Sequence, residues 1–322
     1  VEVVDDMHVA VLGNPFGMKI YTNGVLVIES EDVKTEDGIV NPAVEAGIKT
    51  GDYIKTVNGQ EVTCNEELSQ AVLESNGKGM NVRAVRDGKE FNCVITPVLD
   101  AETGLYRIGI WVRDSSAGIG TLTFYSPSSG VVCGLGHGIC DADTETLLQL
   151  DSGEFVGAQI ISVEKGSDGA PGALKGKFTY ESIANIALNC EKGVYGFMKN
   201  DVNAANLTEI ALKQEVSNGE AQILCTVNGD MPKLYSCTIK KCTSGYSPTQ
   251  NLIVTVTDPA LIEATGGIVQ GMSGSPILQK GKLVGALTHV LISDSVTGYG
   301  IFAENMLETA ESLAKQELKN AS

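Results

Sequence analysis

The sequence predicts a mainly β protein that folds as two domains. Its 322 residues exceed what one hydrophobic core usually serves, so two domains are expected. Short strand signals rich in Val, Ile and Thr recur along the chain, separated by Gly, Asn, Asp and Pro. Helical periodicity appears in only a few places. Short, regularly spaced strands favour a closed or sandwiched antiparallel sheet over alternating strands and helices.

The stretch from about Gly13 to Pro97 is expected to form one small α+β unit. Its strand-like segments are GVLVIES, DYIKTVNG, NVRAVRDG and FNCVITPV. Two short helices are expected between them. In NPAVEAGIKTGD, Pro42 opens a helical turn and Gly47 ends it. In TCNEELSQAVLESNGKG, Asn65 is the expected N-cap.

The segment AVEAGIKTGDYIKTVNGQEV resembles the core of a PDZ domain of the bacterial, protease-associated type. The resemblance rests on a small helix ending at Gly47, a Gly-Asp turn, an apolar strand and the run Val-Asn-Gly. It implies a peptide-binding loop at PFGMKI, where the amides of Phe16, Gly17 and Met18 would hold a chain terminus. A peptide would add as a strand beside MKIY and against the helix near Asn65. A PDZ fold used only for packing or regulation is the alternative.

The second half of the chain predicts an antiparallel barrel. Strand signals include GTLTFYS, GVVCGLG, EFVGAQIISVEKG, EAQILCTVNG, LYSCTIKKC and QNLIVTVTD, and RIGIWVRD is expected to begin this domain. Helices are expected at TYESIANIALN, residues 179–189, and at the C-terminus. The C-terminal apolar stripe, which is expected to pack on the barrel, comprises Met306, Leu307, Ala310, Leu313, Ala314 and Leu318. We place the domains at 8–98 and 99–322.

Charge and composition exclude several classes of partner. Lys and Arg total 23 against 40 Asp and Glu, and a net charge of -17 disfavours binding to phosphate backbones, so nucleic acid is not expected. No apolar run is long enough to span a membrane. The eight cysteines form no CxxC pair, and neither a metal nor a cofactor is expected. Free thiols are favoured over disulfides, with a bridge between Cys237 and Cys242 as the alternative.

The segment GMSGSP is a candidate nucleophile turn. A nucleophilic hydroxyl needs a base, a group that orients the base, and donors for the developing oxyanion. Gly271 and Ser273 lie two positions apart, so a tight turn can aim both amides at one point beside the Ser273 side chain. The pattern Gly-x-Ser-Gly-x-Pro is similar to the nucleophile turn of chymotrypsin-like peptidases, which implies Ser273 rather than Ser275. A glycine-serine turn without chemistry is the alternative.

The chain offers three histidines as the base. His8 lies near the start, and His289 lies in the hydrophobic strand LVGALTHVLIS, where we expect it to line a pocket. His137, in VVCGLGHGICDAD, follows an apolar strand and has glycine on both sides, so its imidazole can reach into a cleft. We therefore expect His137 to be the general base. Asp141 and Asp143 follow it too closely to turn back easily onto its ring.

Three long segments resemble the peptidase domain of the stage IV sporulation protein B (SpoIVB) family, serine peptidases that carry a PDZ domain just ahead of the catalytic domain. They are AGIGTLTFY, GLGHGICDADT and the run from TDPALIEATGG to YGIFAENML. The resemblance covers Gly13 to Leu307, and its motifs place the family's triad on His137, Asp258 and Ser273. In chymotrypsin-like enzymes the acid usually lies far upstream of the serine. Asp258 therefore reflects either an altered topology or support of the serine loop.

The resemblance also implies a biological setting. It implies an exported, membrane-anchored enzyme in the space between forespore and mother cell, and the first residue, Val1, suggests a trimmed chain without its N-terminal segment. The implied substrates are the enzyme itself and a membrane-bound sporulation regulator. Cleavage of this regulator activates a late sigma factor. The PDZ ligand could include its own N-terminal region. A non-catalytic peptide-binding module and a general quality-control protease remain alternatives.

Overall fold

The computed structural model describes residues 7–200, 206–242 and 247–320. The chain forms two compact units. Unit 1 comprises residues 1–19, 117–139 and 153–322, and unit 2 comprises residues 20–116 and 140–152. Two long strands, β2 (Pro15–Ser30) and β11 (Ile110–Ser126), carry the chain from one unit to the other. The predicted mainly β class is confirmed.

The first part of unit 1 is an antiparallel sheet in which β16, β1, β11, β12, β15, β14 and β13 are neighbours in that order. Its core combines Phe124 and Tyr195 with the C-terminal helix. Besides β11, the strands are β1 (His8–Val11), β12 (Val131–Gly134), β13 (Leu150–Glu164), β14 (Ala173–Cys190), β15 (Gly193–Met198) and β16 (Thr208–Glu209).

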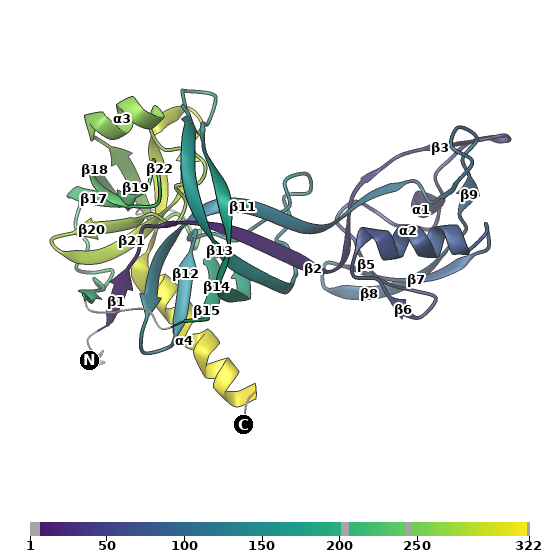
Figure 1. Cartoon of the computed structure of the whole chain (residues 1–322), viewed down its shortest axis with the longest axis horizontal. Coiled ribbons are helices and arrows are strands. Elements are labelled where there is room, and N and C mark those ends of the chain that lie inside the picture. Colours follow the sequence, from purple (N-terminus) through teal and green to yellow (C-terminus); the bar gives the residue numbers. More distant parts are fainter. Residues whose placement is uncertain (1–6, 201–205, 243–246, 321–322) are drawn as a thin grey trace. The chain divides into compact units, whose positions relative to one another are not determined.

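The second part of unit 1 is a closed barrel in the order β17-β18-β19-β22-β21-β20 (Figure 1), as predicted. Alternate inward side chains such as Ile223, Val254 and Leu287 fill it. The elements are β17 (Gly219–Cys225), β18 (Lys233–Lys241), β19 (Leu252–Val256), α3 (Pro259–Thr265), β20 (Pro276–Gln279), β21 (Lys282–Leu291), β22 (Asp294–Phe302) and α4 (Ala303–Asn320).

Unit 2 is the α+β unit expected from the sequence. Figure 1 shows α2 lying along its strands, and the buried Leu68 and Val72 of this helix share a core with Ile54 and Val82. The elements that it adds are β3 (Val33–Thr35), β4 (Gly38–Val40), α1 (Pro42–Glu45), β5 (Tyr53–Val57), β6 (Gln60–Glu61), α2 (Asn65–Glu74), β7 (Met80–Arg86), β8 (Lys89–Ile95), β9 (Val98–Leu99) and β10 (Tyr106–Arg107).

The boundaries of the two units differ from those that we expected. β1 pairs with β11, and β2 begins in unit 1, so the chain starts in the same unit as the barrel. Unit 2 is therefore inserted between β2 and β11 rather than placed before the barrel domain. The segment RIGIWVRD also belongs to unit 2, and β11 runs on from it into unit 1.

This connectivity corrects the predicted peptide-binding loop. Phe16 is fully buried in unit 1, where its ring lies 4.6 Å from that of Phe155. A Cβ at Gly17 would lie 2.5 Å from the ring of Phe178, and Met18 is 6% exposed. All three residues are buried in unit 1 because both faces of β2 are covered at these positions. They do not form the ligand loop of unit 2.

Of the two helices predicted in the second half of the chain, the one at residues 179–189 is wrong and the C-terminal one is confirmed. Residues 179–189 lie in β14, where Ala184 and Ile186 are buried and Asn185 between them is exposed, so the true period is two. Pairing with β13 and β15 overrides the local helical pattern. α4 packs on β12 and β21 with the predicted stripe, except that Leu318 is 71% exposed.

Two further expectations concern cysteines and membrane spans. All eight cysteines are free thiols, so no bridge joins Cys237 to Cys242. Among the described residues, none of the helices is long and apolar enough to cross a membrane.

Candidate active site

The nucleophile turn lies between α3 and β20 and is held by β11. Thr121 Oγ1 donates to the Gly271 carbonyl at 2.9 Å, and Thr123 Oγ1 donates to the Gly274 carbonyl at 2.8 Å. The Thr121 amide also donates to the Ser273 carbonyl at 2.9 Å. Both threonine side chains are buried, and both reach the same turn from β11. Three hydrogen bonds from β11 therefore hold the turn.

The Ser273 hydroxyl lies against β21. Its Oγ donates to the Thr288 carbonyl at 2.7 Å. Ser275, by contrast, is fully buried, and its Oγ donates to the Met272 carbonyl within the turn at 2.6 Å. Ser273 is only partly buried and so keeps access to solvent. Of the two serines, Ser273 is the one placed for chemistry.

Two amides of the turn are candidates for an oxyanion site. The amides of Met272 and Gly274 donate to backbone carbonyls. Within the described part of the chain, the amides of Gly271 and Ser273 donate to no protein acceptor. Gly271 has φ +96°, a conformation that glycine adopts without strain. Two unpaired N–H groups beside a serine hydroxyl can bind a developing negative charge.

The segment that carries His137 contacts β21 at Thr288. The adjacent Gly136 packs on β21 so closely that a Cβ would lie 3.0 Å from Thr288 Cγ2. The carbonyl of Thr288 in turn accepts the Ser273 hydroxyl. Thr288 is therefore a common neighbour of the Ser273 hydroxyl and the segment that carries His137, which brings the predicted nucleophile and base to one region of the barrel wall.

The imidazole of His137 is oriented by the backbone. Its Nδ1 lies 2.8 Å from the Gly138 carbonyl, which only accepts, so Nδ1 carries the proton in the neutral ring. Nε2 is then the basic nitrogen. The next residue, Ile139, is fixed by Asn189, which accepts from the Ile139 amide at 2.8 Å and donates to its carbonyl at 3.0 Å. A carbonyl thus sets the tautomer that a general base needs.

The surrounding protein lowers the pKa of both histidines in this region and so favours their neutral forms. It lowers the pKa of His137 below its usual value near 6.5, although the hydrogen bond to the Gly138 carbonyl acts in the opposite direction. The His289 ring lies 4.6 Å from that of His137, at 34°. His289 keeps solvent contact, but protein around its imidazole and the neighbouring His137 lower its pKa to about 4. His289 therefore places a second neutral imidazole beside His137.

The structure does not bring Asp258 to His137. Asp258 is the N-cap of α3, where Oδ1 accepts from the amides of Ala260 and Leu261 at 3.0 and 3.3 Å. Its Oδ2 accepts from the Ser236 amide at 3.1 Å. The Ser236 amide, together with those of the helix, lowers the pKa of Asp258. An aspartate that precedes proline at the end of a strand is well suited to capping.

Asp258→Asn separates the two roles of this residue. Asparagine caps helices about as well as aspartate, so we expect kcat/KM to stay within about tenfold of the parent protein. An acid that orients the base would instead lose about 10⁴-fold on the same change. Steady-state peptide hydrolysis measures the difference. Asp258→Ala is the control, because it removes the cap and should lower stability by about 1 kcal/mol.

The comparisons with known proteins agree with this chemistry. The family model described as SpoIVB peptidase S55 matches residues 104–307, more than half of the chain. The chain belongs to the SpoIVB peptidase S55 family. The description of this family identifies the matched region as a peptidase domain.

Other relatives match parts of this SpoIVB-family chain. The regulator of sigma-W protease RasP of Bacillus subtilis (strain 168) is 40% identical over 55 residues, which are 17% of this chain and 13% of RasP. The PDZ domain of the SdrC-like protein of Listeria monocytogenes is 21% identical, covers 28% of this chain and 87% of its own, and has a TM-score of 0.23. The chain thus spans only a small share of RasP.

Two similar solved structures are proteases. The thermostable serine protease AL20 of an extremophilic microorganism is 11% identical over 62% of this chain and 92% of its own, with a TM-score of 0.37. The protease Anisep of Arthrobacter nicotinovorans is 15% identical over 62% of this chain and 90% of its own, with a TM-score of 0.36.

Sequence reasoning missed part of the support of the active site in this SpoIVB-family chain. Thr121 and Thr123 hold the turn, and Thr288 holds the hydroxyl, yet none was expected to take part. The alternation of Thr with apolar residues in GTLTF was the available signal, because a buried hydroxyl must find an acceptor. Among the described residues, no three His, Cys, Asp or Glu side chains come together in a group that could hold a metal ion.

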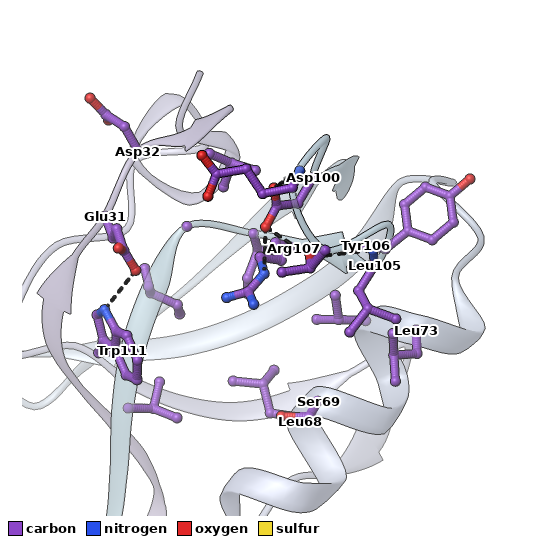
Figure 2. Close-up of a pocket in the computed structure, with 18 of the residues that line it drawn as sticks. Glu31, Asp32, Leu68, Ser69, Leu73, Asp100, Leu105, Tyr106, Arg107 and Trp111 are labelled. Carbon is purple, nitrogen blue, oxygen red and sulfur yellow. Dashed lines mark hydrogen bonds and ion pairs between the residues drawn. The ribbon is translucent and has the colours of Figure 1, made fainter. Parts of the chain in front are cut away.

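Unit 2 contains a pocket of about 650 Å³ between α2 and residues 105–112 (Figure 2). Leu68 and Val72 of α2 are buried on one side, and Ile108 is buried on the other. Trp111 lies at the edge, where its Nε1 donates to Glu31 Oε2 at 2.9 Å. An apolar floor between a helix and an extended segment is suited to the side chains of a bound peptide.

Charged side chains gather on the same pocket. Arg107 pairs through Nε with Asp100 at 3.0 Å, and Lys34 pairs with Glu102 at 2.7 Å. Figure 2 shows Arg107 facing the space between Asp100 and Trp111. The pocket therefore combines an apolar floor with a rim of both charge signs, where the cations Lys34 and Arg107 lie among the carboxylates Glu31, Asp32, Asp100 and Glu102.

Proposed function

We propose that Ser273 and His137 hydrolyse peptide bonds through an acyl-enzyme. The Ser273 Oγ attacks the scissile carbonyl while His137 Nε2 takes its proton, and the amides of Gly271 and Ser273 bind the oxyanion. The imidazolium then gives the proton to the leaving amine. In the second half of the reaction His137 takes a proton from a water molecule, which attacks the acyl-enzyme, and the Ser273 hydroxyl is regenerated as the acid product leaves. The hydroxyl must first turn from the Thr288 carbonyl towards His137.

One observation carries this proposal. The serine hydroxyl that keeps solvent access lies in a turn with two unpaired amides, and its acceptor, Thr288, is also the contact of the segment that carries His137. The Gly138 carbonyl orients the imidazole and so takes the place that we first gave to Asp258. The proposed catalytic group is therefore a Ser-His dyad. The Gly138 carbonyl orients its imidazole.

We further propose that unit 2 binds peptides in the pocket beside α2. A chain terminus would lie near Arg107, whose two terminal amino groups remain for a carboxylate because Nε holds Asp100. Its last apolar side chain would enter between Leu68 and Ile108. Family membership supports the more specific role of an exported sporulation protease that processes itself and cleaves a membrane-bound regulator to activate a late sigma factor.

The pH dependence of labelling by a fluorophosphonate tests the role of His137. The base acts only when it is neutral, and burial lowers its pKa, so the neutral form persists below pH 6.5. We expect the labelling rate to be constant above pH 6.5 and to fall only at more acid pH. If the pH is lowered and the labelling rate is already halved at a pH above 6.5, the result would contradict a buried imidazole base. Absence of labelling at every pH would favour a non-catalytic binding module instead.

A further inference from the structure

The chain passes from the catalytic base into unit 2 within three residues. Unit 1 includes the chain up to Ile139, and Cys140 to Ser152 belong to unit 2. The far end of this segment is also attached to unit 2, where the Gln149 amide donates to the Tyr53 hydroxyl at 3.2 Å. The segment that follows His137 is therefore held by the peptide-binding unit.

An ion pair fixes the near end of this segment. The side chain of Asp141 is fully buried, and Arg113 Nη1 donates to its Oδ2. Arg113 Nη2 also donates to Asp143 Oδ2 at 2.8 Å. The other oxygen of Asp141 accepts from the amides of Asp143 and Thr144 at 3.0 and 2.9 Å. A buried carboxylate that loses its cation is strongly destabilised, so Asp141 must follow any movement of Arg113.

Arg113 lies on the strand that forms the pocket wall. Ile110, Trp111 and Val112 of β11 line the pocket, and Arg113 comes next. Trp111 and Arg113 point to the same face because they are two residues apart. A peptide that adds along this wall would therefore contact β11 immediately before Arg113.

We propose that the Arg113–Asp141 ion pair transmits peptide binding in unit 2 to His137. This coupling rests on the proposed function of both sites. Arg113 and Asp141 are positioning residues: they act on the reaction only by setting the position of the chain that leads back to the imidazole. Ile139, fixed by Asn189, and Asp141, fixed by Arg113, are the two anchors on either side of Cys140.

The experiment measures pocket occupancy and catalytic reactivity separately. Trp111 is the only tryptophan of the chain and lines the pocket, so its emission reports peptide binding. The probe is a short peptide ending in a free valine carboxylate, and the fluorophosphonate labelling rate reports Ser273. In the parent protein we expect the peptide to shift Trp111 emission and to change the labelling rate about fivefold or more.

Variants of the ion pair should separate the two signals. Asp141→Asn and Arg113→Ala are expected to keep the emission change while the peptide alters labelling by less than about twofold, and Arg113→Lys should restore part of the response. Arg83→Ala is the matched control, because it breaks the exposed pair with Glu90 in the same unit. It should respond as the parent protein does.

Each failure has a distinct meaning. Peptide-induced labelling changes in Arg113→Ala and Asp141→Asn that equal those of the parent protein would overturn the coupling. So would a parent protein whose emission shifts while its labelling rate stays constant. A parent protein that is never labelled would overturn the proposed catalysis and the coupling with it. One whose emission never changes would overturn the pocket assignment, and with it the coupling.

Discussion

Ser273→Ala is expected to lower kcat for peptide hydrolysis by about 10⁶-fold, because the replacement removes the atom that forms the acyl-enzyme. The buried Ser275 cannot substitute for it, since its hydroxyl is held by the Met272 carbonyl inside the turn. Ser275→Ala is therefore the matched control and should retain most activity. Steady-state hydrolysis of a peptide substrate, with thermal melting to confirm folding, measures the effect.

His137→Ala should cost about as much as Ser273→Ala, and the double variant should cost no more than either, because the two groups act as one unit. His289→Ala should cost far less, since His289 only stacks on the base. If His289→Ala were as inactive as Ser273→Ala while His137→Ala kept activity, the assignment of the base would be reversed.

Gly274→Ala is expected to displace the nucleophile turn. Gly274 has φ +94°, and a Cβ at this position would lie 1.9 Å from the Thr121 carbonyl oxygen and 2.5 Å from the Leu135 amide. Both contacts are with backbone, so the turn must move. A displacement of about 1 Å costs roughly 100-fold in rate, and the backbone strain adds about 1–3 kcal/mol of instability. Hydrolysis kinetics and thermal melting measure the two effects.

Gly281→Ala is the matched control for this change. Gly281 also has positive φ, +82°, but a Cβ there would meet no atom within 4 Å. It should therefore show only conformational strain of about 1–2 kcal/mol, with catalytic rate preserved. Equal losses of kcat in the two variants would mean that close packing on Thr121 does not position Ser273.

The serine turn and the candidate base could be proposed from the sequence because their signals are local. A turn with glycine at positions 271 and 274 reads directly from the sequence, and His137 stands out because only three histidines compete. Asp258 could not be assigned in the same way. An acidic residue before proline is equally compatible with a helix cap and with a catalytic acid, and only the hydrogen bonds of the folded chain distinguish the two.

The insertion of unit 2 depends on pairing between distant strands. Ala10 pairs with Tyr125, and Val9 pairs with Thr208, contacts that no local pattern reveals. The resemblance to a PDZ domain implies that PFGMKI forms its peptide-binding loop, whereas Phe16 and Met18 of this segment are buried in unit 1. The helix expected at 179–189 failed for a related reason, since sheet neighbours on both sides decide its conformation.

The central claim is that Ser273 is a nucleophile activated by His137. Its most direct test is to treat the protein with a fluorophosphonate and to locate the adduct by fragmentation of the labelled peptide in a mass spectrometer. We predict a single adduct on Ser273 that is absent from Ser273→Ala, strongly slowed in His137→Ala and unchanged in Ser275→Ala. An adduct on Ser275, or equal labelling of Ser273→Ala, would contradict the account.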